Sequence, residues 1–140
     1  MSSANAADRI HSAAIHLIRR VREVDEWMEI TPARASALSV LVFGGPRTLT
    51  ELAQAEQVTT ATMSRLVSAM EAEGLVRRDP HADDARAVWL VPTAKARRIL
   101  EKGRARRTEL LDSLFAHLSP QEREIVRRAA DLVDSAVLPL

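Results

Sequence analysis

The residues best suited to chemistry lie around positions 59–68, where the sequence reads TTATMSRLVS. Met63, Leu66 and Val67 recur at helical spacing and would face a core. The candidate contact residues between and before them are small or hydroxyl-bearing, with one arginine: Thr59, Thr60, Ala61, Thr62, Ser64 and Arg65. Hydroxyls can bond phosphates or base edges, a threonine methyl can contact thymine, and small side chains permit close approach to a groove. These residues therefore predict a helix that enters the DNA major groove; the alternative, a helix packed wholly in a core, conflicts with its polar half.

No pattern typical of an enzyme is present. The chain has no G-x-G-x-x-G, no Walker motif and no H-E-x-x-H. The four histidines lack the close spacing with carboxylates that a zinc site needs: His11, His16, His81 and His117. Without cysteine there is no disulfide and no thiolate ligand. We therefore expect a protein that is not an enzyme and that holds no metal or cofactor.

Charge and hydropathy limit the possible partners. The net charge of +1 does not by itself indicate nucleic acid, but residues 95–107 carry seven Lys or Arg against one Glu. Such a run is either a solvated helix face or an electrostatic footprint. No apolar run approaches the roughly 18 residues of a membrane span. The N-terminal stretch MSSANAADRI lacks the pattern of a signal peptide, so we expect a cytoplasmic protein with no membrane partner.

Helices must position the polar surface. Apolar residues at a spacing near 3.6 predict a first helix over 8–28. Thr31 can cap a second helix, which the GGP sequence at 44–46 ends. We expect Thr50 to open a short third helix and Thr59 to cap a fourth.

The sequence period changes after Gly74, a residue suited to ending the fourth helix. Two β-prone runs separated by a turn with proline and three aspartates predict a hairpin at about 75–91. Thr93 can cap a long fifth helix that ends near His117. The SPQE sequence at 119–122 combines a cap, a proline and a reciprocal glutamate, and predicts the start of the last helix.

The first and last helices carry long apolar stripes around a small centre. Pairing with the same helices of a second copy would bury these stripes, which predicts a homodimer; the alternative is packing within one chain. We assign the helical dimerisation region to residues 1–30 and 108–140, and the central lobe to 31–93. Residues 94–107 would begin the long connecting helix.

The order of these elements resembles the MarR family of bacterial transcription regulators. The resemblance covers about residues 8–138. Its most specific part is a hairpin pattern of Gly-Leu-Val-x-Arg, a variable turn and Asp-x-Arg, which falls on Gly74, Leu75, Val76, Arg78, Asp84 and Arg86. Several positions depart from the family pattern. Among them, Gln57 stands where a glycine is common, and Ala85 replaces the first of two adjacent arginines.

The resemblance implies a mainly α fold with a small β-hairpin, in which a winged helix-turn-helix is joined to a helical dimerisation region. The hairpin would be the wing, with Arg86 probing the minor groove and Asp84 holding the wing in shape. Arg78 would also contact DNA. The implied function is sequence-specific transcription regulation, as a homodimeric repressor on a palindromic operator. The alternative is a winged-helix module for protein–protein interaction without specific DNA binding.

Many such regulators release DNA when a small aromatic or phenolic effector binds between the dimerisation helices and the DNA lobe. On this resemblance, four residues would line the ligand pocket: His11, Trp27, Met28 and Arg34. The alternative is that Trp27 and Met28 belong to the core and Arg34 to the surface.

Overall fold

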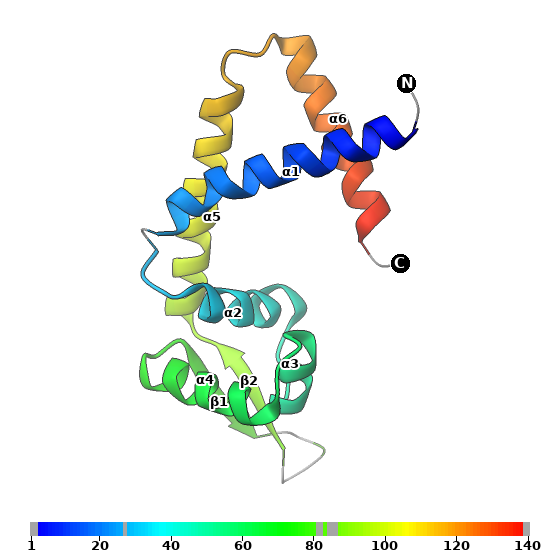
Figure 1. The fold of residues 1–140 in the computed structure, drawn as a ribbon. Helices are drawn as coiled ribbons and strands as arrows, with labels where there is room; N and C mark the ends of the chain where they lie inside the picture. Colours follow the sequence, from blue (N-terminus) through cyan, green and yellow to red (C-terminus); the bar gives the residue numbers. More distant parts are fainter. Residues whose placement is uncertain (1–2, 27, 81–82, 84–86, 139–140) are drawn as a thin grey trace. The chain divides into compact units, whose positions relative to one another are not determined.

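A computed structural model describes residues 3–26, 28–80, 83 and 87–138. The described part contains six helices and one two-stranded antiparallel sheet (Figure 1). In chain order the elements are α1 (Ser3–Asp25), α2 (Pro32–Gly44), α3 (Leu49–Ala55), α4 (Thr60–Ala72), β1 (Val76–Pro80), β2 (Val88–Pro92), α5 (Ala94–Phe115) and α6 (Pro120–Val137). The expectation of a mainly α chain with one small hairpin is confirmed.

The chain divides into two compact units, Met1–Arg106 and Arg107–Leu140, with the division inside α5. The first unit contains the helix-turn-helix and the hairpin, and the second contains the end of α5 and all of α6. The assignment of residues 1–30 and 108–140 to one dimerisation region stays a prediction.

Capping residues set where the helices of the first unit begin. The Thr31 side chain accepts a hydrogen bond from the Arg34 amide, and Thr59 accepts one from the Thr62 amide, as predicted for α2 and α4. The prediction that Thr50 opens α3 is wrong. Thr48 caps this helix, because Glu51 stands three residues after it and bonds back to the Thr48 amide at 3.1 Å.

Helices α3 and α4 end in the same hydrogen-bonded motif. After α4, the Leu75 amide donates to the Met70 carbonyl at 2.8 Å, and Gly74 adopts a φ of +73°. After α3, the Val58 amide donates to the Ala53 carbonyl at 3.0 Å, and Gln57 adopts a φ of +57°. Both are Schellman motifs, which require a left-handed residue. Gln57 therefore takes the conformation for which the family commonly uses glycine.

The hydrophobic core of the first unit joins α2, α3, α4, the hairpin and the start of α5. Its buried residues are Ala37, Leu38, Leu41, Leu52, Ala53, Met63, Val67, Met70, Leu75, Val76, Leu90, Ala96 and Leu100. Burying each leucine or methionine of this set contributes about 1.5–3 kcal/mol before entropy is counted. The core holds one side of α4 firmly and leaves the other side facing outward.

The hairpin is attached to the core at its base. Its register pairs Val76 with Pro92 and Pro80 with Val88. Arg47 extends the sheet by one bridge, in which the Leu90 amide donates to the Arg47 carbonyl at 2.8 Å. The base of the hairpin is therefore fixed.

Helix α6 begins with the predicted capping box. The Ser119 side chain accepts from the Glu122 amide, and the Glu122 carboxylate accepts from the Ser119 amide at 2.8 Å. Every residue of α6 is described, and none of them is buried. No helix in the described ranges has the length and apolar character needed to cross a membrane.

Candidate nucleic-acid interface and adjoining cleft

Helix α4 has one buried side and one exposed polar side. Met63, Val67 and Met70 face the core. Of the predicted contact residues, Thr60, Ala61, Thr62 and Arg65 are exposed and Ser64 is half-buried. Ser68 is exposed as well and lies three residues after Arg65, so it belongs to the same face.

The N-terminal end of α4 favours an anion. The Thr59 hydroxyl accepts from the Thr62 amide at 3.1 Å and donates to the Thr62 hydroxyl at 2.9 Å. The first turn contains no acidic residue. The remaining amides of this turn and the positive end of the helix dipole can therefore attract a phosphate.

Cations from three other elements hold the C-terminal end of α4. Arg34 of α2 binds the Glu73 carboxylate at 2.9 Å, and Lys95 of α5 donates to the Glu73 carbonyl at 2.9 Å. Arg78 of β1 binds the Glu71 carboxylate at 3.2 Å. Positive charge at a helix C-terminus is favourable, so these contacts orient α4.

Arg78 therefore has a structural partner, and its predicted contact with DNA stays a prediction. Arg77, beside it, binds Asp79 through two parallel contacts of 3.0 and 3.1 Å. These hydrogen bonds, together with the attraction between the two charges, raise the pKa of the Arg77 guanidinium. Asp84 and Arg86, the two wing residues implied by the family pattern, lie outside the described residues.

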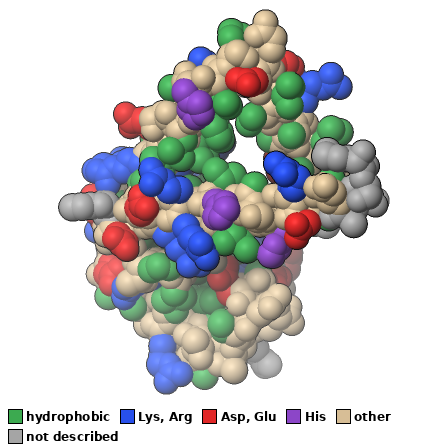
Figure 2. All heavy atoms as spheres, turned by 45° about the horizontal axis from the view of Figure 1, so that its top comes forward, with side chains coloured by type: hydrophobic (Ala, Val, Ile, Leu, Met, Phe, Trp, Pro, Cys, Tyr) green, Lys and Arg blue, Asp and Glu red, His purple; other side chains and the backbone are tan. Residues whose placement is uncertain are grey.

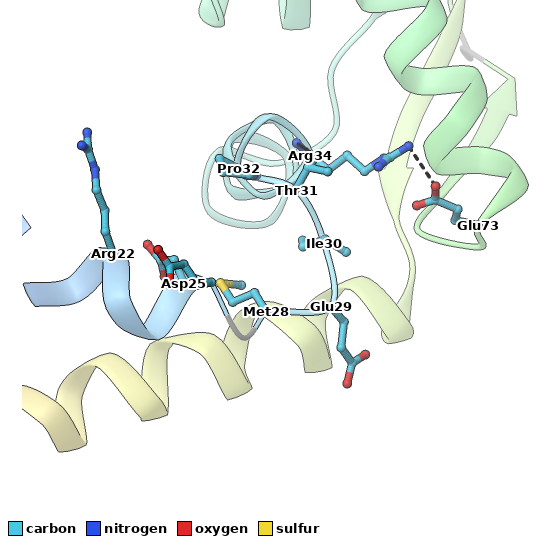
Figure 3. A pocket seen from close by; sticks show the side chains of 10 residues that line it. Arg22, Asp25, Met28, Glu29, Ile30, Thr31, Pro32, Arg34 and Glu73 are labelled. Atoms are coloured by element: carbon cyan, nitrogen blue, oxygen red, sulfur yellow. Dashed lines mark hydrogen bonds and ion pairs between the residues drawn. The ribbon is translucent and has the colours of Figure 1, made fainter. Parts of the chain in front are cut away.

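A cleft of about 800 Å³ lies within the first unit (Figure 3). It is lined by the end of α1, the segment leading to α2, the first turn of α2 and Glu73. Met28 and Arg34 line it, as the resemblance implies. His11 is exposed on α1 and is not among the lining residues, and Trp27 lies outside the described residues.

Charge and hydrogen bonding distinguish Arg34 from the other lining residues. The lining includes four carboxylates, from Asp25, Glu26, Glu29 and Glu73, and two guanidinium groups, from Arg22 and Arg34. The Arg34 side chain points toward Glu73 (Figure 3). Its Nε is buried and has no hydrogen-bond partner among the described residues. Among all the residues that the structure describes, no group of three or more His, Cys, Asp or Glu side chains could hold a metal ion.

A helix-turn-helix with an outward polar face on its second helix, followed directly by an antiparallel hairpin, defines a winged helix-turn-helix protein. The family model described as MarR family matches residues 29–87. An HTH-type transcriptional regulator of Mycobacterium tuberculosis, MT0903.1, is 31% identical over 132 residues, which are 94% of this chain and 92% of that protein. The chain belongs to the MarR family, whose members are DNA-binding transcription regulators.

Solved structures agree with this placement. The transcriptional regulator Tm0710 from Thermotoga maritima has a TM-score of 0.83 and 25% identity, over 96% of this chain and 94% of that one. A MarR family protein from Bacillus stearothermophilus has a TM-score of 0.79 and 27% identity, over 97% of both chains. The resemblance seen in the sequence, the winged-helix fold and the expectation that the chain is not an enzyme are confirmed by these matches.

Proposed function

We propose that the protein is a cytoplasmic, sequence-specific repressor that binds a palindromic operator as a homodimer and releases it when a small aromatic or phenolic effector binds. The observation that carries the DNA-binding part is the outward face of α4. Thr60, Ala61, Arg65 and Ser68 are exposed there on a helix whose other side is anchored in the core. A face of small and hydroxyl-bearing residues with one arginine fits the major groove.

The proposed dimer rests on apolar side chains that the single chain leaves exposed. In α6, Ile125 is 66% exposed, Leu132 69% and Val137 69%. In α1, Ile10 and Ile18 are about half exposed. Hydrophobic side chains are visible between charged ones on the molecular surface (Figure 2). A two-fold dimer through these helices would present two α4 helices to half-sites about one helical turn apart, which explains a palindromic operator.

The effector proposal rests on the cleft. Met28, Ile30 and Pro32 provide apolar surface, and Arg34 provides hydrogen-bond donors. A small ring with an oxygen acceptor matches this combination, because ligand sites pair apolar walls with a few polar groups. Met28 and Arg34 are the proposed contacts, and His11 and Trp27 stay predictions.

The test is a footprint on the DNA upstream of the protein's own gene, followed by fluorescence-anisotropy titration of the protected sequence. We expect Arg65→Ala to weaken operator binding by about 1–3 kcal/mol for each half-site, the usual size of one good groove contact. Arg19→Ala is the charge-matched control, since Arg19 is an exposed arginine of α1, on the side of that helix opposite its apolar stripe. Equal affinities for Arg65→Ala and Arg19→Ala would remove α4 from the interface.

Salt dependence separates this function from the protein-interaction alternative. A DNA-binding dimer loses affinity steeply as salt rises, because phosphate contacts release counterions. A module that recognises only another protein would have the same affinity for DNA of random sequence as for the upstream DNA, or would bind no DNA. Thr62→Ala should change the preference among operator variants; a uniform loss would instead make Thr62 a phosphate contact.

A further inference from the structure

Three successive backbone carbonyls that follow the last turn of α4 accept hydrogen bonds from the start of α5. The Lys95 ammonium donates to the Glu73 carbonyl at 2.9 Å, and the Thr93 hydroxyl donates to the Gly74 carbonyl at 2.6 Å. The Thr93 amide donates to the Leu75 carbonyl at 3.1 Å. Carbonyls at a helix end lack partners within the helix, so these bonds attach α4 to α5. We call the three bonds the α4–α5 junction.

Thr93 has two roles at this junction. Its hydroxyl oxygen accepts from the Ala96 amide at 3.2 Å, which caps α5, while the same hydroxyl donates to the Gly74 carbonyl. A hydroxyl can do both, because it has one donor and two acceptor positions. The bond between the Thr93 amide and the Leu75 carbonyl continues the hairpin ladder beyond its last pair. The base of the hairpin, the end of α4 and the start of α5 therefore meet at Thr93.

Helix α5 leads from the recognition helix into the second unit. Its first turns belong to the same core as α4, because Ala96 and Leu100 are buried in one cluster with Met70. The helix continues without a break from Ala94 to Phe115, and the boundary between the two units falls inside it. Any change of angle between α4 and α5 would therefore change how α4 is held relative to α5 as a whole.

We infer that Thr93 and Lys95 are positioning residues for operator recognition. Through the α4–α5 junction they hold α4 at one angle to α5, and in a dimer this angle sets the separation of the two recognition helices. Neither residue has to contact DNA in this role. The inference rests on the proposed function, because it requires a dimer whose two α4 helices bind two half-sites.

The geometry of DNA makes this separation important. One base pair inserted between two half-sites moves them about 3.4 Å further apart and turns one relative to the other by about 35°. A dimer can meet the new spacing by opening the junction in one subunit. Loss of one hydrogen bond that is partly open to solvent corresponds to about a two- to fivefold loss of affinity. The junction therefore contributes to the preference for one spacing.

The test compares operators of different spacing, with the full chain throughout. Fluorescence anisotropy gives the dissociation constants for the footprinted operator and for the same operator with one base pair inserted at its centre. The spacing ratio is the second constant divided by the first, and it should exceed one in the wild type. Lys95→Met removes one junction bond and keeps the aliphatic part of the side chain. Its spacing ratio should be about two- to fivefold smaller than that of the wild type.

Two substitutions of Thr93 separate the junction from the helix cap. Thr93→Asp keeps an acceptor for the Ala96 amide but cannot donate to the Gly74 carbonyl, so its spacing ratio should fall as in Lys95→Met. Thr93→Ser keeps the hydroxyl and should keep the wild-type ratio. A role in capping alone would predict the wild-type ratio for both variants.

Arg98→Met is the matched control, because it removes an exposed cation of α5 three residues after Lys95. It should keep the wild-type spacing ratio. A purely structural role for Lys95, or a contact between Lys95 and a phosphate, would weaken binding to both operators by the same factor. Either role would leave the spacing ratio unchanged, whatever happened to the melting temperature.

Three results would overturn the inference. They are a wild-type spacing ratio in Lys95→Met, a wild-type ratio in a folded Thr93→Asp protein, and an equal fall of the ratio in Arg98→Met. A wild type that binds both operators equally would refute the proposed palindromic operator, and the inference with it. Absence of any sequence that the wild type binds specifically would refute the proposed function itself.

Discussion

Leu132→Asp tests the proposed dimer interface at a single position. Leu132 lies on the apolar side of α6 and is 69% exposed in the single chain. Full burial of a leucine contributes about 2 kcal/mol, so covering the exposed part contributes about 1.4 kcal/mol. A two-fold interface contains the residue twice, which brings the contribution to about 3 kcal/mol.

An aspartate at this position removes that contribution and places two carboxylates in an apolar interface. Each carboxylate buried without a partner costs several kcal/mol more. The total loss is therefore about 5 kcal/mol or more, which raises the dissociation constant of the dimer by roughly a thousandfold or more. At a concentration where the wild type is dimeric, the variant should be a monomer.

Sedimentation velocity measures this change, and circular dichroism checks that α6 still folds. Ser135→Asp is the control, because it adds the same charge one turn later, where the serine hydroxyl bonds the carbonyl of Asp131 on the polar side. Leu132→Ala, expected to weaken the dimer by about 2–3 kcal/mol, replaces Leu132→Asp if that chain is insoluble. A soluble Leu132→Asp or Leu132→Ala protein with the wild-type dissociation constant would refute the assignment of α6 to the interface.

Two further substitutions test the support of α4. Thr59→Ala should lower the free energy of unfolding by about 1 kcal/mol, because the cap on the Thr62 amide is lost. The melting temperature should fall by roughly 3–5 °C. A fall no larger than that of Thr60→Ala would contradict the capping role. Glu71→Gln should release Arg78 toward phosphate in both subunits and steepen the slope of log affinity against log salt by about 1.8, which is about 0.9 for each subunit. An unchanged slope would show that Arg78 does not reach the DNA backbone.

Features that depend on a few neighbouring residues could be predicted from the sequence. The caps at Thr31, Thr59 and Ser119 were predicted, because a capping side chain bonds an amide only three residues away. The start of α3 was missed although its signal was local. Two threonines compete there, and Glu51 completes a capping box only with Thr48.

The ion pairs around α4 could not be predicted in this way. Arg34 and Arg78 were both singled out, one for a ligand and one for DNA, but their carboxylate partners depend on how α2 and β1 pack against the end of α4. Sequence spacing does not determine which acid a long, flexible arginine meets across a tertiary contact. The buried Nε of Arg34 likewise exists only because neighbouring elements cover it.

Gln57 shows how a departure from a family pattern can leave the backbone unchanged. The Gln57 amide donates to the Gln54 carbonyl at 3.1 Å and the Val58 amide to the Ala53 carbonyl at 3.0 Å, the two bonds that close a Schellman motif. Gly74 closes the same motif after α4, at no steric cost. The left-handed backbone conformation of Gln57 lowers the stability of the fold by about 1 kcal/mol. Burial of the core shared by α3 and α4 offsets this loss many times over. Packing therefore determines the turn, and the residue at position 57 determines only how much strain the turn contains.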